Sequence, residues 1–281
     1  MTLSIDDGCF SVKMQADSTC QHESRISTFV VRYPRFIHAE LLTHRQFSRN
    51  SSSSRAIPIK KLREKVLLNP AMPVYWGKNQ RGMQAGEELV GKRLWLAKQL
   101  WLKSRYVACG VSWALEKLDL HKQVPNRLLE PWMLIDVIIT ATSFSNFFKL
   151  RSHKDAQPEI KKLSDMMMEV YKNSTPALVH YGDWHLPFIT NDLKNRETEV
   201  LKKIAVARCA RVSYTTHEGK IDVNRDVELY KQLINGEPIH FSPCEHVATP
   251  STLGKAHLGN LVGWKSHRYE LERNNETYKK E

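Results

Sequence analysis

The chain has 281 residues, 41% of them hydrophobic, which is enough apolar material for one large domain or two small ones with buried cores. Its 42 Lys and Arg against 30 Asp and Glu give a net charge of +12, which favours an anionic partner, although a basic solvated surface carries the same charge. The longest apolar run, residues 132–141, is too short to cross a bilayer, and the first ten residues lack the apolar core of a secretory signal, so we expect a soluble cytoplasmic protein.

The first clear element is a strand over residues 25–33, where two sets of side chains alternate and both contain β-branched or apolar residues. Pro34 then opens a helix, because proline suits the first helical position and Ile37, Leu41 and His44 follow at helical spacing. This helix leads directly into an unusual polar loop.

The polar loop is the end of the stretch LLTHRQFSRNSSSSRAIP, residues 41–58. Hydroxyl groups and guanidinium groups are dense there, and phosphate favours such donors, with arginine supplying a two-pronged contact. A flexible serine linker is the alternative, but linkers rarely carry the neighbouring His44, Arg45 and Arg55. The loop therefore predicts an anion-binding segment.

Three further helices follow from apolar periodicity. They cover residues 86–118, 158–171 and 223–236, the second starting at a proline and the third ending at a glycine. The methionine triplet at 166–168 is best explained as core filling. The charged tail from residue 265 predicts a peripheral helix. The chain thus reads as mixed α and β, with more helix than strand.

The segment 143–160, SFSNFFKLRSHKDAQPEI, combines an aromatic helical face with polar groups at its end. Core packing explains the phenylalanines but not Arg151, which lies between two apolar helices. A buried arginine needs a partner, and both Asp155 and a bound anion fit that requirement.

Metal chemistry has little support in the sequence. The five cysteines are scattered, and no pair has the C-x-x-C spacing of a zinc or redox site, which favours reduced thiols. The turn IHFSPCEH, residues 239–246, holds His240, Glu245 and His246, but no further histidine or cysteine stands at ligand spacing. We therefore expect no metal centre.

Four motifs together resemble those of the flavin-dependent thymidylate synthases. THRQFSRNSSSSR resembles their R-H-R-x7-S signature, with His44, Arg45 and Ser53 at matching positions and Arg55 at a later arginine. SFSNFFKLRSHKDAQPEI is similar to a second block, and ARVSY and SPCEH are similar to two more. In the family, the blocks similar to ARVSY and SPCEH come before the R-H-R block, whereas here they follow it. The chain therefore resembles a circularly permuted member: one domain over 1–281, with an N-terminal extension at 1–24 and a permuted segment at 196–281.

The resemblance implies an α+β fold, helix-rich with a small antiparallel sheet. It implies FAD as cofactor, methylenetetrahydrofolate and NADPH as co-substrates, and dUMP or a related pyrimidine nucleotide as substrate. The implied assembly is a homotetramer with active sites shared between subunits. Members of this family use no cysteine nucleophile, and the flavin supplies the redox chemistry.

The resemblance also implies roles for single residues. Arg151 would stabilise negative charge that develops on the pyrimidine, and Ser53 is the other catalytic candidate. The substrate-binding set is Glu40, Ser51, Ser53, Ser54, Arg55, Arg127 and Arg151. The cofactor-binding set is His44, Arg45, Asn146, Thr140, Thr142, Ser242, Glu245 and His246.

Several positions depart from the family pattern. Thr43 and Ser51 replace an arginine and an acidic residue, Thr140-Ala141-Thr142 replaces a flavin-facing Asn-x-Arg, and Asn126 stands where an arginine is expected. These changes leave open a hydroxymethyl product or a cytidine nucleotide substrate. A third alternative is a basic nucleic-acid-binding protein without catalysis, which the scattered lysines do not favour.

Overall fold

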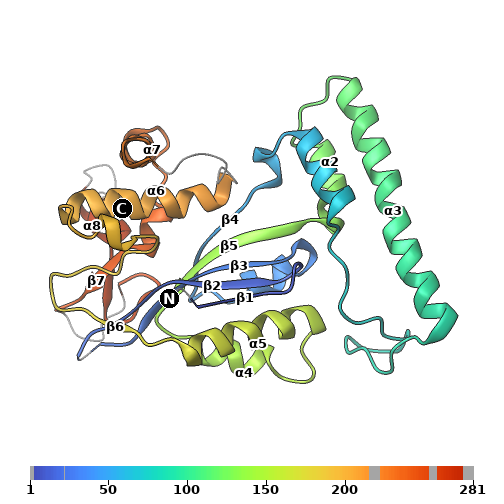
Figure 1. Cartoon of the computed structure of the whole chain (residues 1–281), viewed down its shortest axis with the longest axis horizontal. Coiled ribbons are helices and arrows are strands. Elements are labelled where there is room, and N and C mark those ends of the chain that lie inside the picture. The colour runs from blue at the N-terminus through green and yellow to red at the C-terminus, as the bar shows by residue number, and fades with distance from the viewer. Residues whose placement is uncertain (1–2, 22, 215–221, 253–257, 275–281) are drawn as a thin grey trace.

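The computed structural model describes residues 3–21, 23–214, 222–252 and 258–274 (Figure 1). A curved sheet lies at its centre, with strand order β1-β2-β3-β5-β4 and a short β6 beside β2. Every pairing in this sheet is antiparallel except that of β2 with β6. The strands are β1 Ser4–Asp6, β2 Ser11–Thr19, β3 Ile26–Pro34, β4 Ser48–Ser51, β5 Leu134–Ala141 and β6 Ala177–Leu178.

The strand expected at 25–33 is confirmed as β3, which pairs with β2 on one side and β5 on the other. The segment 1–24, expected to be an extension, contributes β1 and β2 to the sheet. The polar run SVKMQADST gives little strand signal by itself. It becomes a strand because it pairs along the length of β3 and buries its apolar alternate residues, such as Val12 and Met14.

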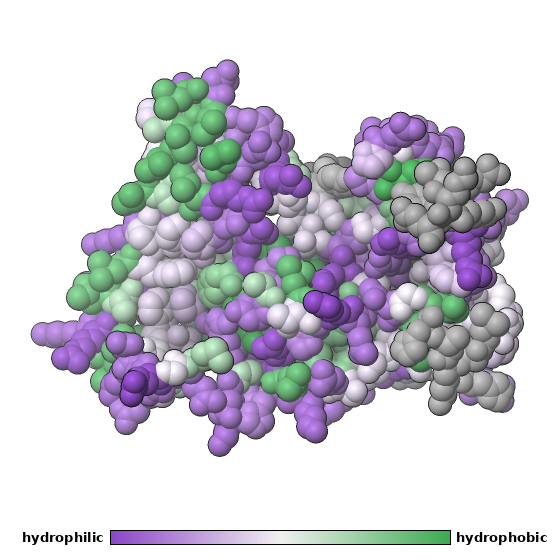
Figure 2. All heavy atoms as spheres, turned by 180° about the vertical axis from the view of Figure 1, so that it is seen from behind, coloured by the Kyte–Doolittle hydropathy of each residue, from purple (hydrophilic) through white to green (hydrophobic). Residues whose placement is uncertain are grey.

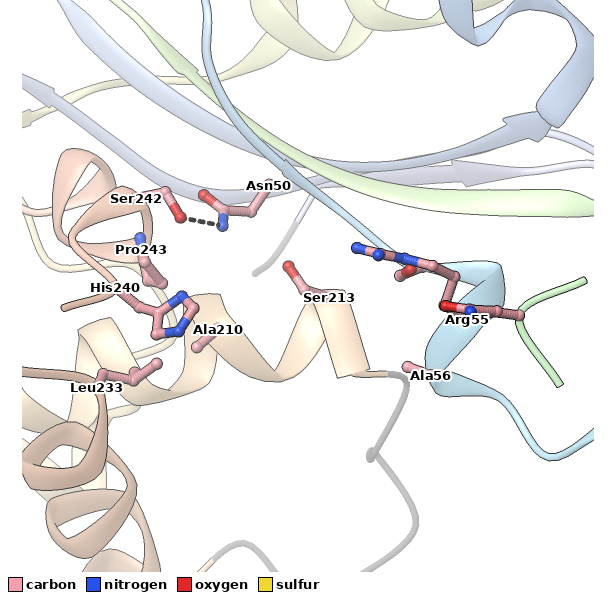
Figure 3. Close-up of a pocket in the computed structure, with 11 residues that line it drawn as sticks. Asn50, Arg55, Ala56, Ala210, Ser213, Leu233, His240, Ser242 and Pro243 are labelled. Carbon is pink, nitrogen blue, oxygen red and sulfur yellow. Dashed lines mark hydrogen bonds between the residues drawn. The ribbon is translucent and has the colours of Figure 1, made fainter. Parts of the chain in front are cut away.

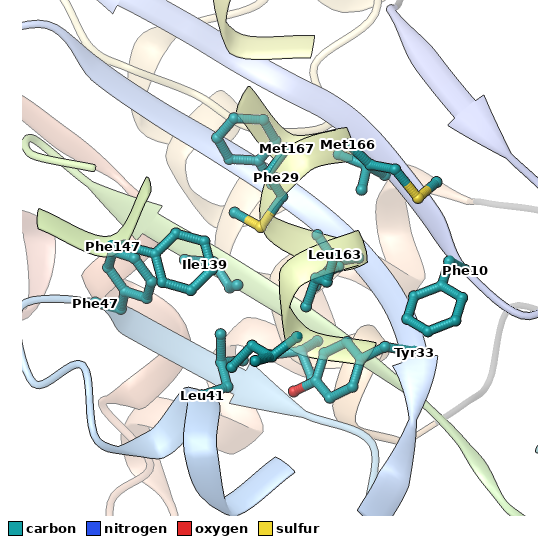
Figure 4. Close-up of a cluster of buried hydrophobic side chains, with 14 of the residues drawn as sticks. Phe10, Phe29, Tyr33, Leu41, Phe47, Ile139, Phe147, Leu163, Met166 and Met167 are labelled. Carbon is teal, nitrogen blue, oxygen red and sulfur yellow. The ribbon is translucent and has the colours of Figure 1, made fainter. Parts of the chain in front are cut away.

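One face of the sheet is covered by α4, Ser145–Arg151, and α5, Pro158–Asn173 (Figure 1). The predicted proline start of α5 is confirmed. Figure 4 shows the resulting core, in which Leu163 and Met167 of α5 pack over strand residues such as Phe29. Met166 and Met167 are both buried, so the core-filling interpretation of these two methionines is confirmed.

The other face is covered by α6, Thr198–Tyr214, which contacts β5 through Cys209, Val212 and Ile138. α7, Val223–Asn235, packs on α6 and is confirmed as the helix predicted at 223–236. Buried Asp226 joins the two helices, accepting hydrogen bonds from Arg208 and Arg211 at 2.9 Å each. α8, His267–Asn274, and a two-stranded sheet of β7, Ala248–Pro250, and β8, Trp264–Ser266, complete this side.

A helical arm extends from the sheet (Figure 1). It consists of α2, Ile59–Leu68, α3, Gly91–Lys117, and the 3-10 helix η3, Pro125–Trp132. α3 confirms the long helix predicted near 86–118. Its inner face packs on α2 and η3, but much of its outer face is apolar and exposed. The large exposed side chains of α3 are Trp95, Leu96, Leu100, Tyr106, Val107, Val111 and Trp113.

Short helices position the polar loops. The helix predicted from Pro34 begins as 3-10 helix η1, Arg35–Ile37, and continues as α1, His38–Leu42, so it ends before His44. The others are η2, Ser54–Ala56, η4, Asn191–Leu193, and η5, Ser242–His246. All five cysteines are free. In the described part of the chain, no helix combines the length and the apolar character that a membrane span requires.

Candidate active site

Edge strand β4 divides the candidate site residues into two groups. Successive strand residues point to opposite faces, so Arg49, opposite Ile139, faces α1 and α4, whereas Asn50, opposite Ile138, faces α6 and η5. We call the group on the Asn50 face the serine-loop pocket and the group around Arg151 the Arg151 cluster.

The serine-loop pocket is a cavity of about 390 Å³ (Figure 3). Its wall joins the early loop to late parts of the chain: the Ser53 amide donates to the Ser213 carbonyl at 3.1 Å, and Asn50 Nδ2 donates to Ser242 Oγ at 3.0 Å. The lining residues are Asn50, Ser53, Arg55, Ala56, Gln123, Ala210, Ser213, Leu233, His240, Ser242 and Pro243.

The serine run is a defined continuation of the sheet edge. The Ser52 amide donates to the Asp136 carbonyl at 2.8 Å, and Ser52 Oγ accepts from the Asp136 amide at 3.1 Å. Ser53 then lines the pocket, and the exposed Arg55 lines it without an ion pair to any described residue. The structure thus contradicts the flexible-linker alternative, and this loop places the Ser53 hydroxyl and the Arg55 guanidinium group at the cavity.

Two predicted substrate residues use their side chains to hold this loop. Ser54 is buried, and its hydroxyl donates to Glu130 Oε1 at 2.8 Å. Arg127 Nη1 donates to the same oxygen at 3.1 Å. Neither lines the pocket. Asn126, which stands where the family has arginine, is buried and donates to the Ser54 and Ile57 carbonyls.

In the Arg151 cluster, Arg151 Nε donates to His44 Nε2 at 2.9 Å and Nη2 donates to Thr43 Oγ1 at 3.0 Å. Asp155 pairs with His153, so of the two partners considered for Arg151, the salt bridge with Asp155 is not formed. Burial, and then the positive charges of Arg151 and Arg49, lower the pKa of His44 to about 4. His44 is therefore neutral at pH 7 and accepts the arginine hydrogen bond.

Further cationic and polar groups lie near this pair. Arg49 Nη1 donates to the His44 carbonyl at 2.7 Å, and Arg45 and Asn146 are exposed. Within the described residues, neither Arg49 nor Arg151 forms a salt bridge with a carboxylate. Glu40 is half-buried, and its Oε2 has no hydrogen-bond partner among the described residues. Ser51 lies on the Arg49 face of β4, opposite Val137.

Four predicted cofactor residues are engaged inside the protein. Buried Thr140 and His246 are hydrogen-bonded to each other at 2.8 Å. Thr142 Oγ1 accepts from the Val262 amide at 3.1 Å, and Glu245 pairs with Arg268 at 2.6 Å. These side chains support the site from behind. The predicted cofactor residues with open access are His44, Arg45, Asn146 and Ser242.

The Arg151 cluster fits a flavin dinucleotide in charge and in surface character. Arg45, Arg49 and Arg151 supply positive charge and form no salt bridge with a carboxylate in the part of the chain that the structure describes, which suits a diphosphate. Leu42 and Leu150, both exposed beside the cluster, offer apolar surface to a flat ring.

Several residues of these two groups carry no sequence signal strong enough to identify them. Arg49 and Asn50 lie inside the quoted loop, but their opposite directions depend on the strand pairing. Gln123 reaches the pocket from the segment before η3. Among the residues that the structure describes, no three His, Cys, Asp or Glu side chains gather as a metal site.

Comparison with solved structures finds a UMP/dUMP methylase, PolB, from Streptomyces cacaoi. With bound 5-Br dUMP it is 15% identical, the match covers 58% of this chain and 89% of that one, and the TM-score is 0.48. With bound 5-Br UMP it is 15% identical, with coverages of 58% and 88% and a TM-score of 0.46. These similarities are too low to support an argument. No curated protein matches the chain.

The family comparison is more informative. A family model described as thymidylate synthase complementing protein, Thy1, matches residues 11–177. The match begins in β2, so it includes part of the segment expected to be an extension, and it includes the serine run and Arg151. Because it spans more than half of the 281 residues, the chain belongs to the Thy1 family, the flavin-dependent thymidylate synthases.

Proposed function

We propose that this protein is an FAD-dependent thymidylate synthase, which converts dUMP to dTMP with methylenetetrahydrofolate and NADPH. Besides family membership, one observation carries the proposal: Ser53 and Arg55 of the early loop line the same cavity as Ser213 and Ser242 from the late segments. All four belong to motifs that resemble the family's blocks.

The serine-loop pocket suits a nucleotide monophosphate. Its volume of about 390 Å³ lies in the range of small-molecule sites. Ser53 would donate a hydrogen bond, and Arg55, which has no acidic partner among the described residues, would pair with the phosphate. Arg127 remains a second candidate for the phosphate, although its contact with Glu130 would have to be exchanged.

Arg151 would act on the pyrimidine. A guanidinium group fixed by His44 and Thr43 is ready to stabilise negative charge on the ring without reorganising. His44, Arg45 and Asn146 would hold FAD, whose contribution when bound is hydride chemistry that side chains cannot supply. Ser242, which lines the serine-loop pocket, would face the nucleotide instead.

The assembly we propose is a homotetramer with shared active sites. In one chain the two groups lie on opposite faces of β4, so the Arg151 that acts on the pyrimidine would come from a different subunit than the serine-loop pocket that holds the nucleotide. The exposed apolar face of α3 gives a surface for self-association, visible as the green band at the upper left of Figure 2. We place the reaction in the cytoplasm.

We also propose that the chain is a single domain with the late segment permuted. The family match ends at residue 177, yet α6 and η5 pack on the same sheet as β4 and β5. Contacts, and not chain order, define a site, so moving a terminal segment can leave the site intact.

The test is to supply dUMP, methylenetetrahydrofolate and NADPH and to identify the product by mass. We expect dTMP, formed by protein that is yellow as purified and releases FAD. A hydroxymethyl nucleotide would replace this proposal with the hydroxymethylase. Colourless protein that forms no product with added FAD and binds DNA would replace it with the nucleic-acid-binding alternative.

A further inference from the structure

Six hydrogen bonds of 2.6–3.0 Å join seven side chains into one continuous chain that ends at the serine-loop pocket. In order, its members are Ser18, His185, Thr28, Thr140, His246, Asn50 and Ser242. The first five are nearly or fully buried. Only Asn50 and Ser242 reach the cavity (Figure 3).

The sheet builds this chain. Ser18, Thr28, Thr140 and Asn50 come from the neighbouring strands β2, β3, β5 and β4. Strand alternation directs them to the face covered by α6, and in β2 the register shift between Met14 and Ala16 brings Ser18 to that face. Thr28 and Thr140 are directly paired, and their hydroxyl oxygens lie 2.6 Å apart. The two histidines bridge the remaining gaps.

The direction of every hydrogen bond follows from one end. Asn50 Nδ2 donates to Ser242, so its Oδ1 faces His246 and accepts from Nε2–H at 3.0 Å. Burial lowers the pKa of His246 to about 3, so the ring is neutral and its Nδ1 accepts from the Thr140 hydroxyl. Thr140 has one hydrogen only, so Thr28 must donate to Thr140.

The same reasoning fixes the second histidine. The Thr28 hydrogen is already used, so Thr28 accepts from His185 Nε2–H at 2.8 Å. Burial lowers the pKa of His185 to about 4, so this ring is also neutral, and its Nδ1 accepts from Ser18 at 2.9 Å. Both histidines are therefore in the Nε2–H form.

The consequence appears at the pocket. Ser242 Oγ accepts from Asn50, which leaves the Ser242 hydroxyl hydrogen available, and Asn50 Nδ2 keeps a second hydrogen. Neither hydrogen has a partner among the described residues. This part of the pocket wall therefore offers donors to a ligand.

We propose that this chain of hydrogen bonds fixes Asn50 and Ser242 as hydrogen-bond donors and thereby selects a uracil nucleotide over a cytosine nucleotide. Uracil presents a carbonyl oxygen at C4, which can accept a hydrogen bond from these donors. Cytosine presents an amino group there, and when this donor faces the protein donors, neither side has an acceptor. Thr28, Thr140 and His185 are then positioning residues that act through His246. The inference rests on the proposed nucleotide site.

Cutting the chain tests the proposal. Thr140→Val keeps the side-chain shape but removes the donor to His246 Nδ1, so His246 can change tautomer and the Asn50 amide can turn to present its oxygen. The matched control is Thr249→Val. It removes a buried hydroxyl that donates to the Asp183 carbonyl and takes no part in the chain of hydrogen bonds.

Two measurements are made on each protein. Nitrogen-15 NMR of labelled histidine should show both His185 and His246 as Nε2–H in the unaltered protein and in Thr249→Val, and mixed tautomers of His246 in Thr140→Val. The dissociation constant of dCMP should be larger than that of dUMP. The ratio of the first constant to the second should fall about tenfold in Thr140→Val and stay unchanged in Thr249→Val.

An Nδ1–H tautomer of either histidine in the unaltered protein overturns the inference even if Thr140→Val does not fold. An unchanged dCMP/dUMP ratio in folded Thr140→Val, or tighter binding of dCMP by the unaltered protein, also overturns it. The NMR measurement needs no ligand. If neither nucleotide binds, the proposed function and the proposed selection both fail. The histidine tautomers still decide whether the hydrogen bonds from Ser18 to Ser242 run in the direction given above.

Discussion

The two faces of β4 solve opposite electrostatic problems. On the pocket face, the threonines and histidines of the hydrogen-bond chain are buried and neutral and satisfy one another, as His246 and Thr140 do. On the other face, Arg49 and Arg151 lie beside His44 and form no salt bridge with a carboxylate of the described residues. Burial, and then the charge of the two arginines, lowers the pKa of His44 and keeps it neutral. The buried part of the hydrogen-bond chain is complete without a ligand, whereas the Arg151 cluster gains most from an anion.

This difference indicates a division of labour. A satisfied network holds geometry and discriminates through the direction of its hydrogen bonds. An uncompensated set of cations supplies affinity for anions and stabilises negative charge. Substitutions should therefore differ in kind: those within the hydrogen-bond chain should change stability and selectivity, and those in the Arg151 cluster should change turnover.

The largest effect should come from Asp226→Ala, which removes the common partner of the buried Arg208 and the half-buried Arg211. We expect a loss of about 3–5 kcal/mol in the free energy of unfolding, because charged groups remain buried without compensation. Urea unfolding measures it. The control is Asp222→Ala at the N-cap of the same helix, which should cost about 1 kcal/mol. Equal losses would show that the ion cluster does not hold α6 to α7.

Arg151→Ala should lower turnover by about 10²–10³-fold and leave the thermal unfolding temperature almost unchanged, because the loss is in transition-state stabilisation. Single-turnover conversion of dUMP measures the first and calorimetry the second. Lys149→Ala, at an exposed position of α4, is the control. Near-normal turnover in Arg151→Ala would remove Arg151 from the mechanism.

Arg55→Ala should weaken dUMP binding by roughly ten- to a hundredfold, the value of one charged hydrogen bond. Binding of deoxyuridine, which lacks the phosphate, should not change. Calorimetric titration of both ligands makes the comparison. Arg127→Ala is the comparison variant, because the Arg127 side chain already donates to Glu130. A phosphate-specific loss in Arg127→Ala instead would transfer the phosphate role to Arg127.

Acid should destabilise the pocket face. Burial lowers the pKa values of His185 and His246 from 6.5 in the unfolded chain to about 4 and about 3 in the folded protein. Below pH 6.5 these histidines therefore bind protons in the unfolded state that they do not bind in the folded state. Stability should be full above pH 6.5 and fall by roughly 1.4 kcal/mol per pH unit per histidine towards pH 4. His185→Gln should reduce that slope in urea unfolding. A stability that stays flat from pH 7 to pH 5 would contradict the neutral buried histidines.

Local pattern was informative where a segment decides its own structure. The periodicity of residues 158–171 and 223–236 and their terminal proline and glycine specify α5 and α7, because helical hydrogen bonds and one apolar face are local properties. Strand β2 and the early end of α1 were missed, because pairing with β3 and the chain's turn toward β4 depend on distant partners.

The sequence by itself determined the chemistry available to this protein: the serine loop with Arg55, the Leu-Arg pair at Arg151, and family motifs that are recognisable in any order. Tertiary structure alone decided which of these groups meet. Strand alternation in β4 turns Asn50 to one face and Arg49 to the other, and His185, which belongs to no motif, joins the network only because the sheet places Thr28 beneath it. The reason is physical: residue type fixes what a group can donate or accept, but only the packed backbone fixes the neighbour that receives it.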